Sequence, residues 1–147
     1  MKGMFVLTII ALAALSFGCD DLVPDAGGNW EAQLNSYTTW SLALTQSSTD
    51  LTGTLKTTIA QDQAGDSPLA EYLPTADLDL TGKIATSKVV LNKTYDADVQ
   101  GQKVPITLNF DLTLSDDKTK MDGTVNFGGI PADKVPDATQ NVSFTKK

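Results

Sequence analysis

The chain has 147 residues and a net charge of −7, and it contains no His and no Arg. Without His it lacks the usual general base, the Ser-His-Asp triad and the commonest zinc ligand. Without Arg it lacks a bidentate clamp for phosphate or carboxylate, and an acidic surface repels nucleic acid. We therefore expect no enzyme activity, no cofactor, no metal and no nucleic-acid partner.

Residues 1–18 have the layout of a secretory signal. A charged start at Lys2 precedes an apolar run over residues 4–15, which is shorter than the ~20 apolar residues that a membrane-spanning helix needs. The chain then reads LSFGC and ends this segment at Cys19, which resembles the lipobox of bacterial lipoproteins, with Ser16 where that family usually has Leu. The resemblance implies cleavage before Cys19 and acylation of its sulfur and new amino group by chains such as palmitate.

The resemblance also implies a place for the protein. Two or three acyl chains hold a protein firmly, whereas one binds only marginally, so the chain is expected to be lipid-anchored in the bacterial cell envelope and to face the periplasm or the cell surface. Two alternatives stay open: Cys19 is a free thiol behind an ordinary signal, or residues 1–18 remain as an uncleaved anchor. Residues 19–28 are predicted to form an acidic, flexible tether, and residues 29–147 one domain.

Apolar residues recur at every second position through most of the remaining chain, which is the period of a half-buried strand. Short polar turns join the segments, so consecutive strands are expected to pair in an antiparallel meander. The fold prediction is all-β: an eight-stranded up-and-down barrel, with a two-sheet β-sandwich as the alternative. The predicted strands are 28–35, 39–46, 51–60, 77–85, 88–96, 103–114, 120–127 and 140–147.

Three of these strands repeat an apolar residue two positions before a glycine, namely Gly53, Gly82 and Gly123. A glycine inside a strand marks strong bending or the close approach of a neighbour. We expect these glycines to relieve crowding inside the barrel, with Trp30 as the large side chain that crosses there.

The motif Gly28-Asn29-Trp30, with Leu51-Thr52-Gly53-Thr54 and the strand count, resembles the calycin group: lipocalins, fatty-acid-binding proteins and avidins. In lipocalins a basic residue of the last strand stacks on the Trp, and the resemblance assigns that role to Lys146 or Lys147. Avidins line their pocket with later tryptophans, and this chain has none after Trp40, so biotin is not the expected ligand.

The first functional hypothesis is a protein that holds a small apolar or amphiphilic ligand inside the barrel. Lys93 and Tyr95 share the inward face of their strand if it is regular, Tyr72 lies in the long 61–76 connection at the mouth, and Trp40 lies in the wall. A buried ammonium needs an anionic partner, so Lys93 would hold a carboxylate. A register shift of one residue would instead turn it outward.

The second hypothesis is a solid barrel that serves as an envelope structural lipoprotein or binds an envelope protein. In that case the apolar residues of 68–73, the one stretch with helical character, cap the open end of the barrel. An enzyme that uses carboxylates alone is the third and weakest hypothesis, because no two acids stand at a fixed functional spacing.

Overall fold

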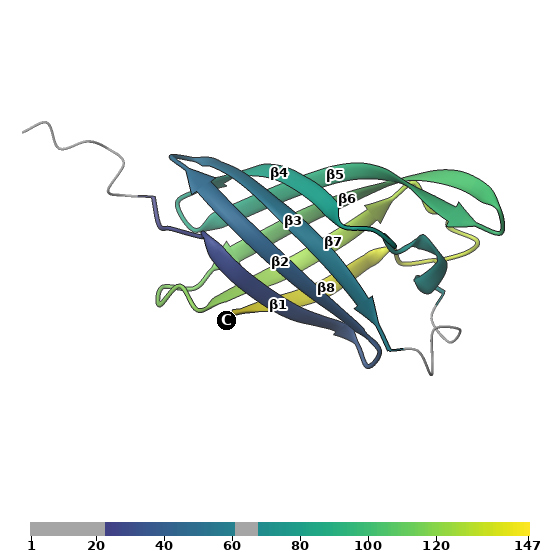
Figure 1. Cartoon of the computed structure of the whole chain (residues 1–147), viewed down its shortest axis with the longest axis horizontal. Helices are drawn as coiled ribbons and strands as arrows, with labels where there is room; N and C mark the ends of the chain where they lie inside the picture. Colours follow the sequence, from purple (N-terminus) through teal and green to yellow (C-terminus); the bar gives the residue numbers. More distant parts are fainter. Residues whose placement is uncertain (1–22, 61–67) are drawn as a thin grey trace, which may run out of the picture.

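The alternating apolar residues place one face of every strand inside a single closed sheet (Figure 1). The computed structural model describes residues 23–60 and 68–147. Each strand pairs antiparallel with the next, and the last pairs with the first, so the predicted barrel is confirmed and the sandwich is not formed. The strands are β1 (Gly28–Asn35), β2 (Thr38–Ser47), β3 (Asp50–Ile59), β4 (Leu78–Ala85), β5 (Lys88–Val99), β6 (Gln102–Leu114), β7 (Lys120–Gly128) and β8 (Thr139–Lys146).

Strand β6 shows how the sequence produces the two faces of the wall. Ile106, Leu108 and Phe110 are at most 1% exposed, whereas Asn109 and Asp111 between and beyond them are exposed. Each fully buried side chain of this size contributes about 1.5–3 kcal/mol of transfer free energy. Strand β5 runs three residues beyond its predicted end, because Val99 still pairs with β6 across the hairpin.

The barrel has two chemically different ends, which Figure 1 shows at left and right. The end that we call the N-terminal end receives residues 23–27 and the C-terminus, and it carries the turns at 48–49 and 86–87 and the loop 115–119. The opposite end, called the loop end, carries the turns at 36–37 and 100–101, the segment 68–77 and the loop 129–138.

Strand β4 is short, and this leaves an opening in the wall near the loop end. Its pairing with β3 stops at Leu78, and its pairing with β5 stops where Thr81 meets Asn92. Residues 93–99 of β5 therefore have no β4 neighbour. The segment 68–77, which contains the 3-10 turn η2 (Ala70–Tyr72), packs against β5 there.

The repeated glycines lie where neighbouring backbones approach too closely for a side chain. A Cβ on Gly82 would lie 1.8 Å from the carbonyl oxygen of Val90, and one on Gly123 would lie 2.0 Å from that of Asp111. The expected close approach is confirmed. The atoms nearest these glycines belong to the adjacent strand, and the crossing of Trp30 stays a prediction.

Among residues 23–60 and 68–147, no helix is long and apolar enough to cross a membrane. The predicted signal segment and Cys19 lie outside the described residues.

Replacing Gly82 by Ala should destabilise the barrel by about 3 kcal/mol, because the new methyl group meets backbone that cannot move aside. Gly128→Ala is the matched control, since a Cβ there would lie 3.6 Å from its nearest neighbour, which is ordinary contact. Urea unfolding followed by circular dichroism measures both. Equal midpoints for the two variants would contradict the close approach.

Candidate functional site

Aromatic side chains fill the interior where a ligand would sit. The ring centroids of Trp40 and Phe110 are 5.5 Å apart, those of Trp40 and Phe127 are 6.0 Å apart, and those of Phe110 and Phe144 are 6.1 Å apart. All four side chains are at most 1% exposed. These separations are typical of packed aromatic pairs, so the rings form a continuous layer across the barrel.

Trp40 belongs to this core. Its side chain is 0% exposed, and its indole Nε1 donates a hydrogen bond to Thr57 Oγ1 at 3.1 Å. Within the described part of the chain, no buried side-chain nitrogen or oxygen lacks a hydrogen-bond partner. The interior therefore offers no unsatisfied polar group for a ligand to meet.

The loop end is closed by the apolar residues that the sequence suggested as a cap. Leu69, Tyr72 and Leu73 are 7%, 5% and 2% exposed, and Val135 from the loop 129–138 is 6% exposed. They join the same core cluster as the barrel interior. The segment 68–77 therefore replaces the missing part of the wall beside β5.

Tyr95 and Tyr72 are brought together at this cap. The Tyr95 hydroxyl donates a hydrogen bond to the backbone carbonyl of Tyr72, 23 positions earlier in the chain. Because the Tyr95 ring is half-buried, desolvation raises the pKa of its phenol above the ordinary value of 10.0. The hydroxyl thus fastens η2 to the wall as a neutral donor.

A hollow of about 300 Å³ lies beside this contact, between η2 and the β5–β6 hairpin. Its walls combine the apolar side chains of Tyr72, Val99 and Val104 with polar ones. The polar residues are Glu71, Gln100, Gln102 and Lys134. Such a mixture suits a small group that is apolar at one end and polar at the other.

Lys93 is exposed, although its register is regular. It pairs with Leu108, and Leu91 two residues earlier is 0% exposed on the same face. Lys93 therefore keeps the inward strand position that was expected, with no register shift, but its side chain is exposed. Lys93 lies just past Asn92, where β5 loses its β4 neighbour, and its side chain is exposed there. The predicted set is thus divided: Tyr72 and Tyr95 meet, while Trp40 is in the core and Lys93 in solvent.

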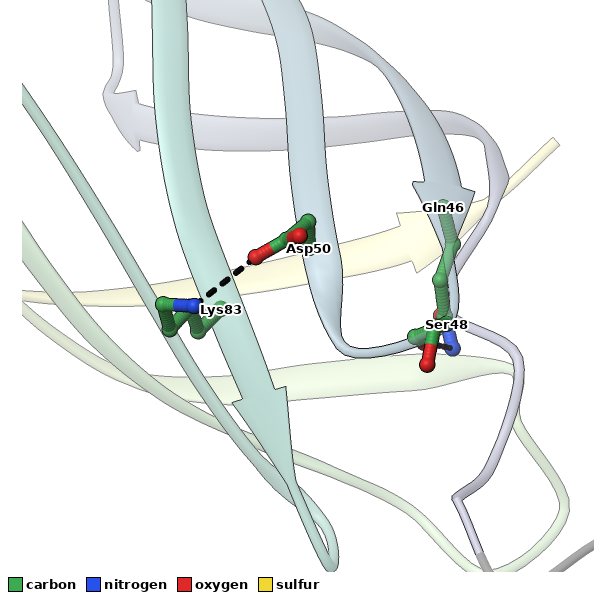
Figure 2. A network of polar contacts seen from close by, with 4 residues as sticks. All are labelled: Gln46, Ser48, Asp50 and Lys83. Atoms are coloured by element: carbon green, nitrogen blue, oxygen red, sulfur yellow. Dashed lines mark hydrogen bonds and ion pairs between the residues drawn. The ribbon is translucent and has the colours of Figure 1, made fainter. Parts of the chain in front are cut away.

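The sequence reasoning missed a second set of contacts at the N-terminal end. Gln46 Oε1 accepts a hydrogen bond from the backbone N–H of Ala26 at 2.8 Å, and Gln46 Nε2 donates to the carbonyl of Pro24 at 3.2 Å. The same Nε2 donates to the carbonyl of Ser48 at 2.9 Å (Figure 2). A signal was present, because Gln46 follows Trp40, Leu42 and Leu44 at an inward position of β2.

Trp30 completes this set. Its indole Nε1 donates to the carbonyl of Ala26 at 3.0 Å, and Ala26 is 0% exposed. Lys146 Nζ lies 5.3 Å from the Trp30 ring centroid, so a lysine of the last strand covers the tryptophan of the first. Lys147 instead pairs with Glu31 at 2.9 Å.

The described residues contain no group of three or more His, Cys, Asp or Glu side chains placed to hold a metal ion. No family model, no curated protein and no solved structure matches the chain.

Replacing Tyr95 by Phe should lower the free energy of unfolding by about 1 kcal/mol at pH 7, because the Tyr72 carbonyl loses its donor. In the native chain the raised pKa means that the folded protein keeps a proton that the unfolded chain releases. This stabilisation is complete below pH 10 and is lost as the pH rises further. The variant should therefore lose less stability than the native chain above pH 10.

Urea unfolding at pH 7 and at pH 10–11.5 measures both effects. Tyr37→Phe is the control, because Tyr37 is also half-buried and its hydroxyl makes no hydrogen bond among the described residues. An alkaline loss of stability that is the same in native and Tyr95→Phe proteins would refute the role of the phenol.

Proposed function

We propose that the chain is a lipid-anchored lipoprotein of the bacterial cell envelope whose barrel is a solid interaction module for an envelope protein. The observation that supports a solid barrel is the filled interior, where four aromatic side chains pack against one another: Trp40, Phe110, Phe127 and Phe144. The lipid anchor is supported by the signal-like residues 1–18 and by the LSFGC run that ends at Cys19.

Packing energies favour a solid barrel over a carrier. An eight-stranded barrel is just wide enough either to be filled by side chains or to hold one small ligand. Removing the contacts of one buried Phe or Trp costs about 3–5 kcal/mol. A fatty acid in the interior would have to displace more than one of the four rings. The interior also presents no unpaired donor for its carboxylate within the described residues.

A second candidate function is favoured by the hollow at the loop end. A small amphiphile would place its apolar part against Tyr72, Val99 and Val104, and its polar part toward Lys134 or the two glutamines. This keeps the expected small ligand but moves it from the interior to the mouth. Of the residues that the sequence suggested for binding, Tyr72 lines this hollow. Tyr95 holds Tyr72 in place through its hydrogen bond to the Tyr72 carbonyl.

Residues 20–147, purified without an acyl group, should carry no bound lipid and take up none from a mixture of fatty acids, because the interior has no room. Native mass spectrometry measures this directly. If fatty acid is taken up, two variants locate it. Val104→Asp changes the wall of the hollow, and Val90→Asp is its control, since Val90 is 41% exposed on the outer wall. Uptake that is lost in Val104→Asp and kept in Val90→Asp would place the ligand in the hollow. Uptake that neither variant changes would contradict the solid barrel.

Replacing Cys19 by Ala in the full chain should abolish incorporation of a palmitate analogue, because the acylated sulfur is removed. Ser16→Leu is the matched control, since it restores the usual lipobox residue and should keep the protein in the membrane. If Cys19→Ala still incorporates the palmitate analogue, acylation of Cys19 is refuted.

A further inference from the structure

The N-terminal segment is fixed to one end of the barrel before it continues toward Cys19. Gln46 binds the backbone of Pro24 and Ala26, and Trp30 binds the carbonyl of Ala26. Asp25 Oδ1 accepts a hydrogen bond from the backbone N–H of Gly27 at 2.7 Å, which shapes the same segment. Four hydrogen bonds therefore define the point at which the chain leaves the barrel. We call this set of contacts the N-terminal clasp.

The clasp limits how far the barrel can be from an acylated Cys19. Consecutive residues span at most about 3.6 Å, so the stretch from Cys19 to Pro24 reaches no more than about 18 Å. The wall is longer: the 13 residues of β6 rise ~3.3 Å each along a tilted strand, which gives a height of about 30 Å. An inverted barrel, with its loop end on the lipid, is therefore out of reach.

Charge acts in the same direction. Six of the ten lysines in the described residues lie at the N-terminal end, and three of them form ion pairs with acids there: Lys83 with Asp50, Lys88 with Asp111, and Lys147 with Glu31. Figure 2 shows the first of these pairs beside the β2–β3 turn. The other three are Lys118, Lys120 and Lys146.

Acids outnumber lysines at both ends, but the excess is larger at the loop end, where Lys103 and Lys134 lie among six acids, whereas the N-terminal end has six lysines and seven acids. An anionic lipid surface repels such an end over a Debye length of about 8 Å. A barrel lying on its side would bring these acids to the headgroups. The acids are Glu71, Asp77, Asp96, Asp98, Asp133 and Asp137.

From the clasp and the charge distribution we infer that the barrel stands on the membrane with its N-terminal end toward the lipid and its loop end outward. The inference rests on the proposed acylation of Cys19. It assigns the N-terminal end as the lipid-facing surface. It also makes the loop end, with η2 and the hollow lined by Val99 and Val104, the surface that an envelope partner meets.

The orientation is measured by energy transfer on vesicles. The chain from Cys19 onward, which contains the whole barrel, is coupled through its single thiol to a maleimide lipid in phosphatidylcholine vesicles with one third phosphatidylglycerol. A donor dye is placed by azidophenylalanine at Asp116, at the N-terminal end, or at Gln100, at the loop end. Headgroup-labelled lipid is the acceptor. We expect transfer at least twofold more efficient from position 116, and equal or reversed efficiencies would overturn the inference.

Gln46→Ala tests whether the clasp sets the orientation, because it removes the bonds to Pro24, Ala26 and Ser48. The difference between the two dye positions should shrink in this variant and persist in the control Gln102→Ala at the loop end. An unchanged difference in Gln46→Ala would refute the role of the clasp. Chemical coupling supplies the anchor here, so this result is independent of whether a cell acylates Cys19.

Discussion

Trp30 links the closing seam of the barrel to the point where the chain leaves it. A sheet loses its edges only when its first and last strands pair, and β1 and β8 share only two ladder pairs, one of which joins Trp30 to Lys146. The same Lys146 covers the indole ring, and the indole N–H holds the carbonyl of Ala26. Trp30 therefore takes part both in the β1–β8 pairing and in the clasp that holds the N-terminal segment. Its cation–π contact with Lys146 alone stabilises the fold by about 0.5–2 kcal/mol.

A filled interior imposes its own constraint on the wall. To bring Phe110 and its partners into contact across eight strands, the sheet coils until Gly82 and Gly123 lie against the backbone of the next strand. The buried aromatic rings and the two glycines therefore belong to the same packing arrangement. Because interiors are close-packed, a ligand inside the barrel would have to displace several of these buried side chains.

The strands were predictable because their signal is local: an alternation such as that of Ile106 to Leu114 needs no knowledge of the neighbouring strands. The site residues depend on distant ones. Lys93 is exposed just past the point where β4 ends its pairing at Asn92, and Tyr95 meets a carbonyl 23 positions away. Gln46 was a missed signal, since an amide at an inward strand position has to find polar partners, which residues 24–26 supply.

The two ends of the barrel differ in how much of their surface the chain itself uses. At the N-terminal end, Gln46 and Trp30 are occupied by residues 24–26, and Lys147 is paired with Glu31. At the loop end, the polar groups around the hollow, such as Gln102, border open space. A barrel that is solid inside can bind only through its outer surface. Hollows lie at both ends, since one at the N-terminal end is lined by Val23, Asp25, Gln46 and Ser48. The hollow at the loop end differs because loops presented by rigid strands form it and the chain's own N-terminal segment does not border it.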